Sequence, residues 1–252
     1  MLSLPVETVI FDLDGTLRHN VPSADDTQFQ IANQLGANVP VGLQLLGARW
    51  AHAYWAQSPE LVEDLRKFGE PDENFWVHYS FRYLLALTVP TERAMELAPI
   101  LSQRMEAEFT PMNYVAPDVA PTLKSLKKAG FSVGLVSNRS LPCHEECEQL
   151  GLLEYFDFAY VAAEVEAWKP DPRIFDRALE LSCTSPERAI YVGDNYYADI
   201  IGAHNAGLQP VLFDRDCVFP DADCAVIKSV GELLGLLGIN GKPAGEMAFC
   251  DA

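Results

Sequence analysis

Basic residues are scarce in this chain of 252 residues, which has 18 Lys and Arg against 36 Asp and Glu and a formal net charge of -18 at pH 7. Proteins that bind nucleic acid or anionic membranes depend on a basic surface. We therefore expect neither as a partner. An anionic substrate would have to be attracted locally, by a metal ion or by a few placed cations.

Long apolar runs are also missing. No stretch approaches the length of a membrane span, and the first residues lack the basic and then apolar pattern of a signal peptide, so we expect a cytoplasmic protein. Repeats and low-complexity segments are absent as well. With 49% apolar residues the chain can bury a sizeable core, and its length is compatible with one core that carries an insertion.

The six cysteines include no Cys-x-x-Cys pair, which favours free thiols in a reducing compartment. Cys143 and Cys147 could share one helix face and, with His144, form half of a metal site. No second ligand pair of matching spacing follows, however. A small buried thiol is the commoner role for cysteine, so free buried thiols are the expected state.

The most informative stretch is the apolar run from Val6 to Phe11, followed by Asp12, Leu13, Asp14 and Gly15. A run rich in β-branched and aromatic residues predicts a strand buried on both faces of a parallel sheet. The two carboxylates are two residues apart, so in extended backbone they lean to the same side. Such a pair repels unless a cation lies between its members, and hard oxygen ligands suit Mg²⁺. An isolated Asp-x-Asp-Gly can also be a simple polar turn.

Residues 18–110 lack strand-like runs, and their apolar residues recur at helical spacing. This pattern predicts an all-helical insertion. We expect its aromatic residues, including Trp50, Trp55 and Trp76, to form the core of a small helical bundle. Its cations, such as Arg82, are expected mostly at the surface.

After Pro111 strands and helices alternate, which predicts right-handed crossovers and a parallel sheet with helices on both faces. The expected strands are 131–136, 156–161, 189–192, 209–213 and a short one at 225–227, and the expected helices are 117–129, Ser140 to Gly151, 173–181, 198–206 and 230–237. The predicted fold is therefore α/β: a Rossmann-like core formed by residues 1–17 and 112–252, with a helical cap formed by residues 18–111.

Ligands of such sheets bind beyond the carboxyl ends of the strands. Polar side chains follow several of the predicted strands, and a lysine lies in a loop of the same half. They are Asp12, Asp14, Ser137, Asn138, Lys169, Asp194 and, one helical turn further on, Asp199. We expect these groups to meet at one edge of the sheet.

Together these groups suit phosphoryl transfer, in which a carboxylate attacks phosphorus and water then hydrolyses the acyl phosphate. Mg²⁺ between Asp12, Asp194 and a phosphate oxygen would remove the repulsion between anions. Lys169 and Ser137 could hold the phosphate oxygens, and Asp14 is placed to give and take the proton. Asp199 would orient Lys169 or a metal-bound water.

Four segments in this order resemble the motifs of the haloacid dehalogenase-like phosphatase superfamily: Asp12-Leu13-Asp14-Gly15-Thr16, Ser137-Asn138, Lys169-Pro170 and Gly193-Asp194 with Asp199. The resemblance spans residues 6 to about 214 and is closest to the subgroup with a helical cap. It implies a Mg²⁺-dependent phosphatase of a small phosphorylated metabolite. Asp12 would be the nucleophile, and Asp14 the acid and base whose backbone carbonyl also binds metal. Thr16, Ser137 and Asn138 would contact the phosphate, Lys169 would neutralise charge, and Asp194 would be the second metal carboxylate.

Two features leave the substrate open. Members of the superfamily often carry an acidic residue where this chain has His19, and the cap carries no recognisable motif. A phosphomutase would use the same core groups, and a non-catalytic binding protein on the same fold is a further alternative. A haloacid dehalogenase would need neither Asp14 nor Asp194, and a phosphoacceptor signalling domain would need no Asp14 and no insertion.

Overall fold

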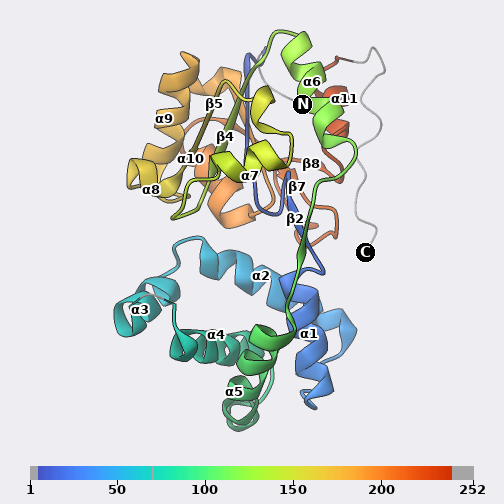
Figure 1. Ribbon diagram of the computed structural model, residues 1–252, viewed down its shortest axis with the longest axis vertical. Coiled ribbons are helices and arrows are strands. Elements are labelled where there is room, and N and C mark those ends of the chain that lie inside the picture. The colour runs from blue at the N-terminus through green and yellow to red at the C-terminus, as the bar shows by residue number, and fades with distance from the viewer. Residues whose placement is uncertain (1–4, 70, 240–252) are drawn as a thin grey trace. The chain divides into compact units, whose positions relative to one another are not determined.

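The computed structural model describes residues 5–69 and 71–239. The chain forms two compact units, one made of residues 1–19 and 115–252 and the other of residues 20–114. We call them the sheet unit and the helical unit (Figure 1). No helix among the described residues is long and apolar enough to cross a membrane.

A six-stranded parallel sheet forms the centre of the sheet unit, in the order β5-β4-β1-β6-β7-β8. Its strands are β1 (Thr8–Phe11), β4 (Ser132–Ser137), β5 (Phe158–Val161), β6 (Ala189–Gly193), β7 (Gln209–Phe213) and β8 (Ala225–Ile227). The predicted α/β fold and parallel sheet are confirmed. Phe11 of β1 pairs with Leu135 of β4 on one side and with Val192 of β6 on the other. The residues that follow β1, β4 and β6 therefore come to the same edge of the sheet.

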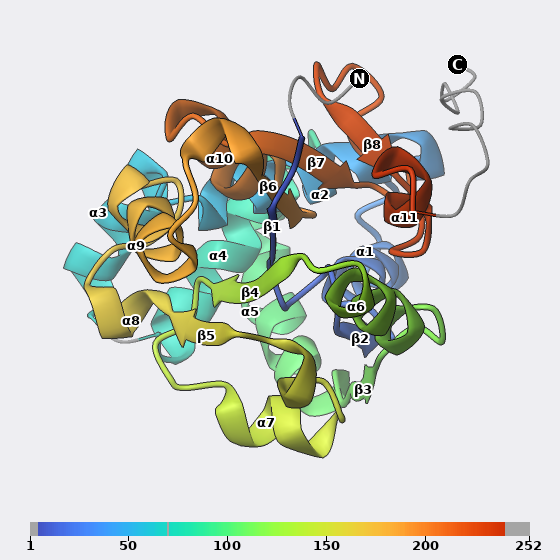
Figure 2. The same ribbon diagram turned by 90° about the horizontal axis from the view of Figure 1, so that it is seen from above.

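Helices cover both faces of this sheet (Figure 2). They are α6 (Val119–Lys128), α7 (His144–Gln149), α8 (Ala162–Val165), α9 (Pro172–Ser182), α10 (Ile201–Asn205) and α11 (Glu232–Leu236), with a π-helical turn at Tyr196–Ile200. Val9 and Phe11 pack with the core residues of α6, α7 and α11, whereas Ile10 packs with those of α9 and α10. Alternation along one buried strand thus builds two apolar layers.

The largest difference from the predicted helices is at α7, which begins at His144 rather than near Ser140. The chain turns directly after β4, where the backbone N–H of Arg139 donates to the carbonyl of Ser137 at 3.0 Å. Residues 140–143, which the prediction placed at the start of the helix, instead connect this turn to α7.

The helical unit contains α1 (Ala24–Gln34), α2 (Gln44–Trp55), α3 (Pro59–Phe68), α4 (Glu73–Ala86) and α5 (Thr91–Glu108). Two short strands that the sequence did not predict, β2 (His19–Val21) and β3 (Met112–Tyr114), pair with each other. Three residues are too few for a period of two to be visible in the sequence.

The aromatic residues of the helical unit only partly follow the prediction. Tyr54, Phe75 and Tyr79 are buried in one cluster, and Trp50 packs against it. Trp55 and Trp76, predicted as core, are instead 37% and 42% exposed. Two large indole rings therefore lie at the surface of this unit.

A buried carboxylate lies among the described residues of the helical unit. Asp64 of α3 is 1% exposed and accepts two hydrogen bonds from Arg82 of α4, at 2.9 and 3.0 Å. The hydroxyl of Tyr54 donates a third, at 3.0 Å. Arg82, predicted as a surface cation, is 20% exposed and pairs with this carboxylate, because a buried carboxylate needs a paired charge.

The cysteines are mostly free thiols. Cys143, Cys147, Cys183 and Cys224 are free, and the first two lie in the buried core of the sheet unit. Cys217 is in a disulfide, which corrects the prediction for that residue, since spacing along the chain does not reveal proximity in space. Cys250 lies outside the described residues.

Candidate active site

Three acidic side chains meet at the carboxyl edge of the sheet. Asp12 follows β1, Asp194 follows β6, and Asp199 lies in the π-helical turn after β6. Each offers a carboxylate oxygen, and these oxygens lie within 4.8 Å of one another. The backbone N–H of Asp12 donates to the carbonyl of Val192 at 2.9 Å, so the pairing of β1 with β6 sets their spacing.

Lys169 lies among these carboxylates and is 2% exposed. Its Nζ is 2.6 Å from Oδ1 of Asp12 and 2.7 Å from Oδ1 of Asp199. Burial alone would lower the pKa of Lys169, but the two carboxylates reverse this effect and raise it well above its ordinary value. The lysine therefore stays charged at neutral pH.

A tyrosine completes the surroundings of Lys169. The ammonium group donates to the hydroxyl oxygen of Tyr191 at 2.9 Å, and Tyr191 in turn donates to the carbonyl of Val136 at 2.8 Å. The sequence analysis missed Tyr191 because it lies within an apolar strand and reads as core. The sequence did carry one indication of its role: Tyr191 is a hydroxyl-bearing residue in an otherwise apolar strand that ends at the site.

Asp194 is fixed from two sides. The hydroxyl of Thr16 donates to its Oδ1 at 3.0 Å, and Gly15 lies against its carboxylate. A Cβ atom on Gly15 would come within 2.3 Å of Oδ2 of Asp194, and its φ of +88° is one that glycine adopts readily. Burial, followed by the charge of Asp199, raises the pKa of Asp194 to about 7.

Ser137 and Asn138 follow β4, as predicted, but they have different surroundings. Ser137 is 2% exposed. The side chain of Asn138 bonds to the backbone of Lys169, donating to its carbonyl at 2.9 Å and accepting from its N–H at 2.7 Å. The amide of Asn138 thus holds the backbone of the loop that carries Lys169.

Asp14 pairs with two arginines that the sequence analysis did not select. Arg139 donates to both of its carboxylate oxygens at 2.5 Å, and Arg18 donates to Oδ1 at 2.9 Å. Glu146 of α7 pairs with both arginines. Arg139 follows Ser137 and Asn138 directly, so its place after a strand end could have indicated it.

His19 differs from the acidic residue expected at its position. Its ring centroid is 5.6 Å from that of Phe213. Burial and the nearby Arg215 lower the pKa of His19. A neutral imidazole packed on an aromatic ring gives this position no negative charge at neutral pH.

The donor set at the sheet edge fits a hard divalent cation. Asp12, Asp194 and Asp199 face the single ammonium group of Lys169, which leaves an excess of negative charge in a buried place. Carboxylate oxygens are the ligands that Mg²⁺ prefers. By contrast, the Cys143 and Cys147 alternative does not hold, because both thiols pack in the apolar core.

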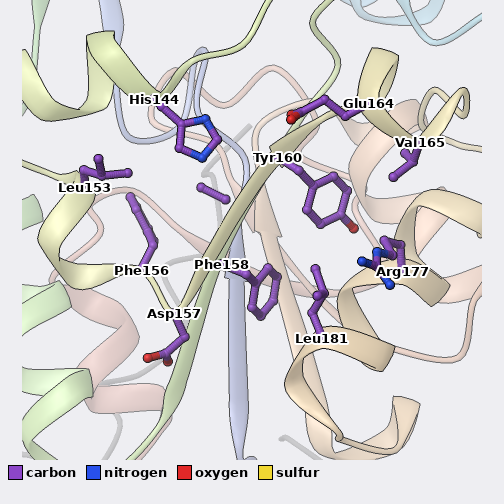
Figure 3. Close-up of a pocket in the computed structure, with 11 residues that line it drawn as sticks. His144, Leu153, Phe156, Asp157, Phe158, Tyr160, Glu164, Val165, Arg177 and Leu181 are labelled. Carbon is purple, nitrogen blue, oxygen red and sulfur yellow. The ribbon is translucent and has the colours of Figure 1, made fainter.

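The hollow drawn in Figure 3 lies elsewhere on the sheet unit, along the outer strand β5. It measures about 510 Å³ and is lined by Phe158 and Tyr160 of β5 and by His144, Glu164 and Arg177 from nearby helices. Among the described residues that line it there is none of the predicted site residues.

Comparison with known proteins agrees with the motifs. The family model described as haloacid dehalogenase-like hydrolase matches residues 6–207. A glyceraldehyde 3-phosphate phosphatase from Pyrococcus furiosus is 30% identical over 241 residues, which cover 92% of this chain and 93% of the relative. The haloacid dehalogenase-like hydrolase domain-containing protein 3 of Mus musculus is 32% identical over 161 residues, 64% of this chain. The match spans 63% of that mouse protein, just under two thirds of its length.

The solved structures give the same fold. A 2-haloacid dehalogenase from Pseudomonas syringae pv. Tomato DC3000 is 27% identical, with a TM-score of 0.54, and the alignment covers 92% of this chain and 98% of that one. This fold therefore also occurs in a protein named a 2-haloacid dehalogenase.

Proposed function

Because the chain belongs to the haloacid dehalogenase-like hydrolase family, we propose that it is a Mg²⁺-dependent phosphatase that hydrolyses a small phosphorylated metabolite through an aspartyl-phosphate intermediate. The observation that carries this proposal is the state of Asp12. Its Oδ1 pairs with Lys169, and no hydrogen bond among the described residues engages its Oδ2. One oxygen is held in place while the other is available as a nucleophile.

In the first step, a carboxylate oxygen of Asp12 forms a bond to phosphorus while the bond from phosphorus to the ester oxygen breaks. Asp14 gives a proton to the departing alcohol. In the second step, Asp14 takes a proton from a water molecule that attacks the same phosphorus, which releases inorganic phosphate and restores Asp12. Lys169 and Ser137 stabilise the phosphate oxygens as charge shifts.

Asp12, Asp194 and the backbone carbonyl of Asp14 would hold Mg²⁺, which supplies positive charge to offset the carboxylates and the phosphate. Thr16 would fix Asp194 through the hydrogen bond described above. Asp199 would orient Lys169, from which it is 2.7 Å away. Asn138 would position the lysine loop.

Asp14 has a further requirement in this scheme. Both oxygens of its carboxylate accept hydrogen bonds from Arg139, and one of them also accepts a hydrogen bond from Arg18. Delivery of a proton to the leaving group therefore requires Asp14 to leave at least one arginine when substrate binds.

We further propose that residues 18–111 act as a cap that selects the substrate. A triose phosphate belongs among the first candidates, because the relative from Pyrococcus furiosus is named glyceraldehyde 3-phosphate phosphatase. If the helical unit selects the substrate, substitutions within it will change the order of preference among esters while leaving metal dependence intact.

Dehalogenation is the second candidate, favoured by the likeness to the Pseudomonas syringae enzyme. Halide displacement by a carboxylate needs neither a proton donor nor a metal. It therefore leaves the presence of Asp14 and Asp194 unexplained. A phosphomutase remains a third possibility, because it uses the same core groups and returns the phosphate to a second hydroxyl.

The test is a panel of phosphomonoesters that includes glyceraldehyde 3-phosphate and p-nitrophenyl phosphate, assayed with Mg²⁺ and with a chelator. A 2-chloro acid is assayed in parallel for halide release. Metal-dependent phosphate release supports the proposal. Halide release without phosphate release would replace it with dehalogenation, and phosphate found on a new hydroxyl would indicate a mutase.

A further inference from the structure

The helical unit contains a hollow of its own, of about 670 Å³. It lies between α1, α4 and α5 and reaches the end of α2. This volume is within the range of pockets that hold small organic molecules. All of its lining residues belong to the helical unit, so it can be considered without the sheet unit.

Three buried polar side chains from three different helices line this hollow: Gln28 of α1, Ser80 of α4 and Ser102 of α5. They are 4%, 2% and 8% exposed. Across the described residues, none of these side chains forms a hydrogen bond to another protein group. A polar group that lines a hollow and makes no bond to the protein is available to a bound molecule.

Serines on helices of this chain can be satisfied locally. The hydroxyl of Ser182 in α9 donates to the carbonyl of Ala178 at 2.9 Å, and that of Ser125 in α6 donates to the carbonyl of Pro121 at 2.8 Å. Ser80 and Ser102 make no such bond although both lie within helices. Their hydroxyls are therefore open to a molecule in the hollow.

Aromatic rings form another side of the hollow. Trp55, Trp76 and Tyr79 line it, with ring centroids 5.5 Å apart for Trp55 and Tyr79 and 6.0 Å apart for Trp55 and Trp76. The two indoles are the side chains that proved exposed rather than buried. Aromatic faces bind apolar bodies and attract organic cations.

The charged residues that line the hollow are all acidic. Asp72, Glu73 and Glu106 are its charged members, and no lysine, arginine or histidine is among the described residues that line it. An anion would be repelled here, which excludes the phosphate group of the proposed substrate. An ammonium group would be attracted by the carboxylates and by the rings.

We propose that this hollow binds a small organic amine, with its apolar or aromatic body against Trp55 and Trp76 and its polar group bonded to Gln28 and the two serines. The proposal concerns lining residues of the helical unit alone. The proposal is tested by binding rather than by turnover. Its outcome therefore does not depend on whether the proposed phosphatase activity is found.

The probes are 2-phenylethylamine, 2-phenylethanol and 3-phenylpropionate, which share a ring and differ in charge. Binding to the full chain is followed by tryptophan fluorescence and by calorimetry. We expect saturable binding of the amine, binding of the alcohol weaker by about 10-fold, and no binding of the carboxylate. Equal affinity for amine and carboxylate would overturn the proposal, as would no saturable binding of any probe at roughly millimolar concentration.

A matched pair of variants locates the binding. Gln28→Leu keeps the size of the side chain and removes its polar atoms, whereas Gln34→Leu makes the same change further along α1, at an exposed position that accepts a hydrogen bond from Arg104. Gln28→Leu should weaken amine binding by about 10-fold, and Gln34→Leu should not. Ser102→Leu, which fills the hollow, should abolish binding. Parent-like affinity in folded Gln28→Leu and Ser102→Leu variants would contradict the proposed site.

Discussion

The hydroxyl of Tyr191 lies between the ammonium group of Lys169, from which it accepts a hydrogen bond at 2.9 Å, and the carbonyl of Val136, to which it donates at 2.8 Å. Lys169 also pairs with Asp12 and Asp199. Its ammonium group donates hydrogen bonds to Asp12, to Tyr191 and, at 3.4 Å, to the carbonyl of Val136, so three acceptors match its three N–H bonds. Tyr191, a residue of strand β6, thus helps to hold Lys169 beside Asp12, the proposed nucleophile.

Tyr191→Phe removes one of these acceptors and the hydrogen bond that its hydroxyl donates to the Val136 carbonyl, which still accepts the longer bond from Lys169. We expect kcat/KM to fall by about 10-fold, because Lys169 is held less firmly, and the free energy of unfolding to fall by about 1–3 kcal/mol. Steady-state kinetics and urea unfolding measure the two effects.

Tyr160→Phe is the matched control, because the hydroxyl of Tyr160 donates to the carbonyl of Ile174 and not to Lys169. It should lose stability with unchanged kcat/KM. Equal kinetic losses in the two variants would show that the effect is structural and not transmitted through the lysine.

Arg139→Ala removes the guanidinium group that engages both oxygens of Asp14. We expect Asp14 to lose its fixed position and kcat to fall by about 10-fold. The loss should be larger for alkyl phosphates than for p-nitrophenyl phosphate, whose leaving group needs no proton. Arg139→Lys should recover part of the rate. A faster Arg139→Ala enzyme would show instead that the arginine restrains Asp14.

Gly15→Ala places a Cβ within 2.3 Å of the carboxylate of Asp194. We expect loss of Mg²⁺-dependent activity by about 100-fold or more, because a displaced carboxylate no longer shares the cation with Asp12. Gly130→Ala is the control, since its φ of +90° is similar but no atom lies within 4 Å of its added Cβ. It should cost about 1 kcal/mol of stability and no activity. Similar activity of the two variants would contradict the claim that the close approach of residue 15 to the Asp194 carboxylate is what matters for activity.

Asp64→Ala removes the buried carboxylate that pairs with Arg82. We expect the free energy of unfolding to fall by about 3 kcal/mol, because the partly buried guanidinium group of Arg82 and the hydroxyl of Tyr54 both lose their hydrogen-bond acceptor. Glu180→Ala, which removes a carboxylate from an exposed pair with Arg177, should change it by less than about 1 kcal/mol. Chemical denaturation of both variants decides whether burial controls the size of the loss.

The sheet and the meeting of polar groups at its edge could be predicted because a parallel sheet brings all carboxyl ends of its strands to one side. Asp12 and Asp194 could be assigned to this edge from the sequence alone, because each directly follows a predicted strand. The partners of Asp14 could not be predicted, since Arg139 is 125 residues away in sequence and spacing carries no information on such pairs. The same holds for Tyr191, whose strand reads as apolar core.

The helical unit was less predictable in detail. Helical spacing indicated its helices but not which aromatic residues are covered, because burial depends on how the helices pack. Trp55 and Trp76 were expected in the core and are exposed. The polar lining of the hollow beside them, formed by side chains from three helices, has no signal in any single helix.

The central claim is that Asp12 forms a covalent bond to phosphorus. The most direct measurement is acid quenching of the enzyme during turnover of a radiolabelled phosphate ester with Mg²⁺, followed by peptide mapping. We predict label on the peptide that contains Asp12, absent when a chelator replaces the metal and absent in Asp12→Asn. Turnover at the parent rate by Asp12→Asn, or label on a different residue, would contradict the mechanism.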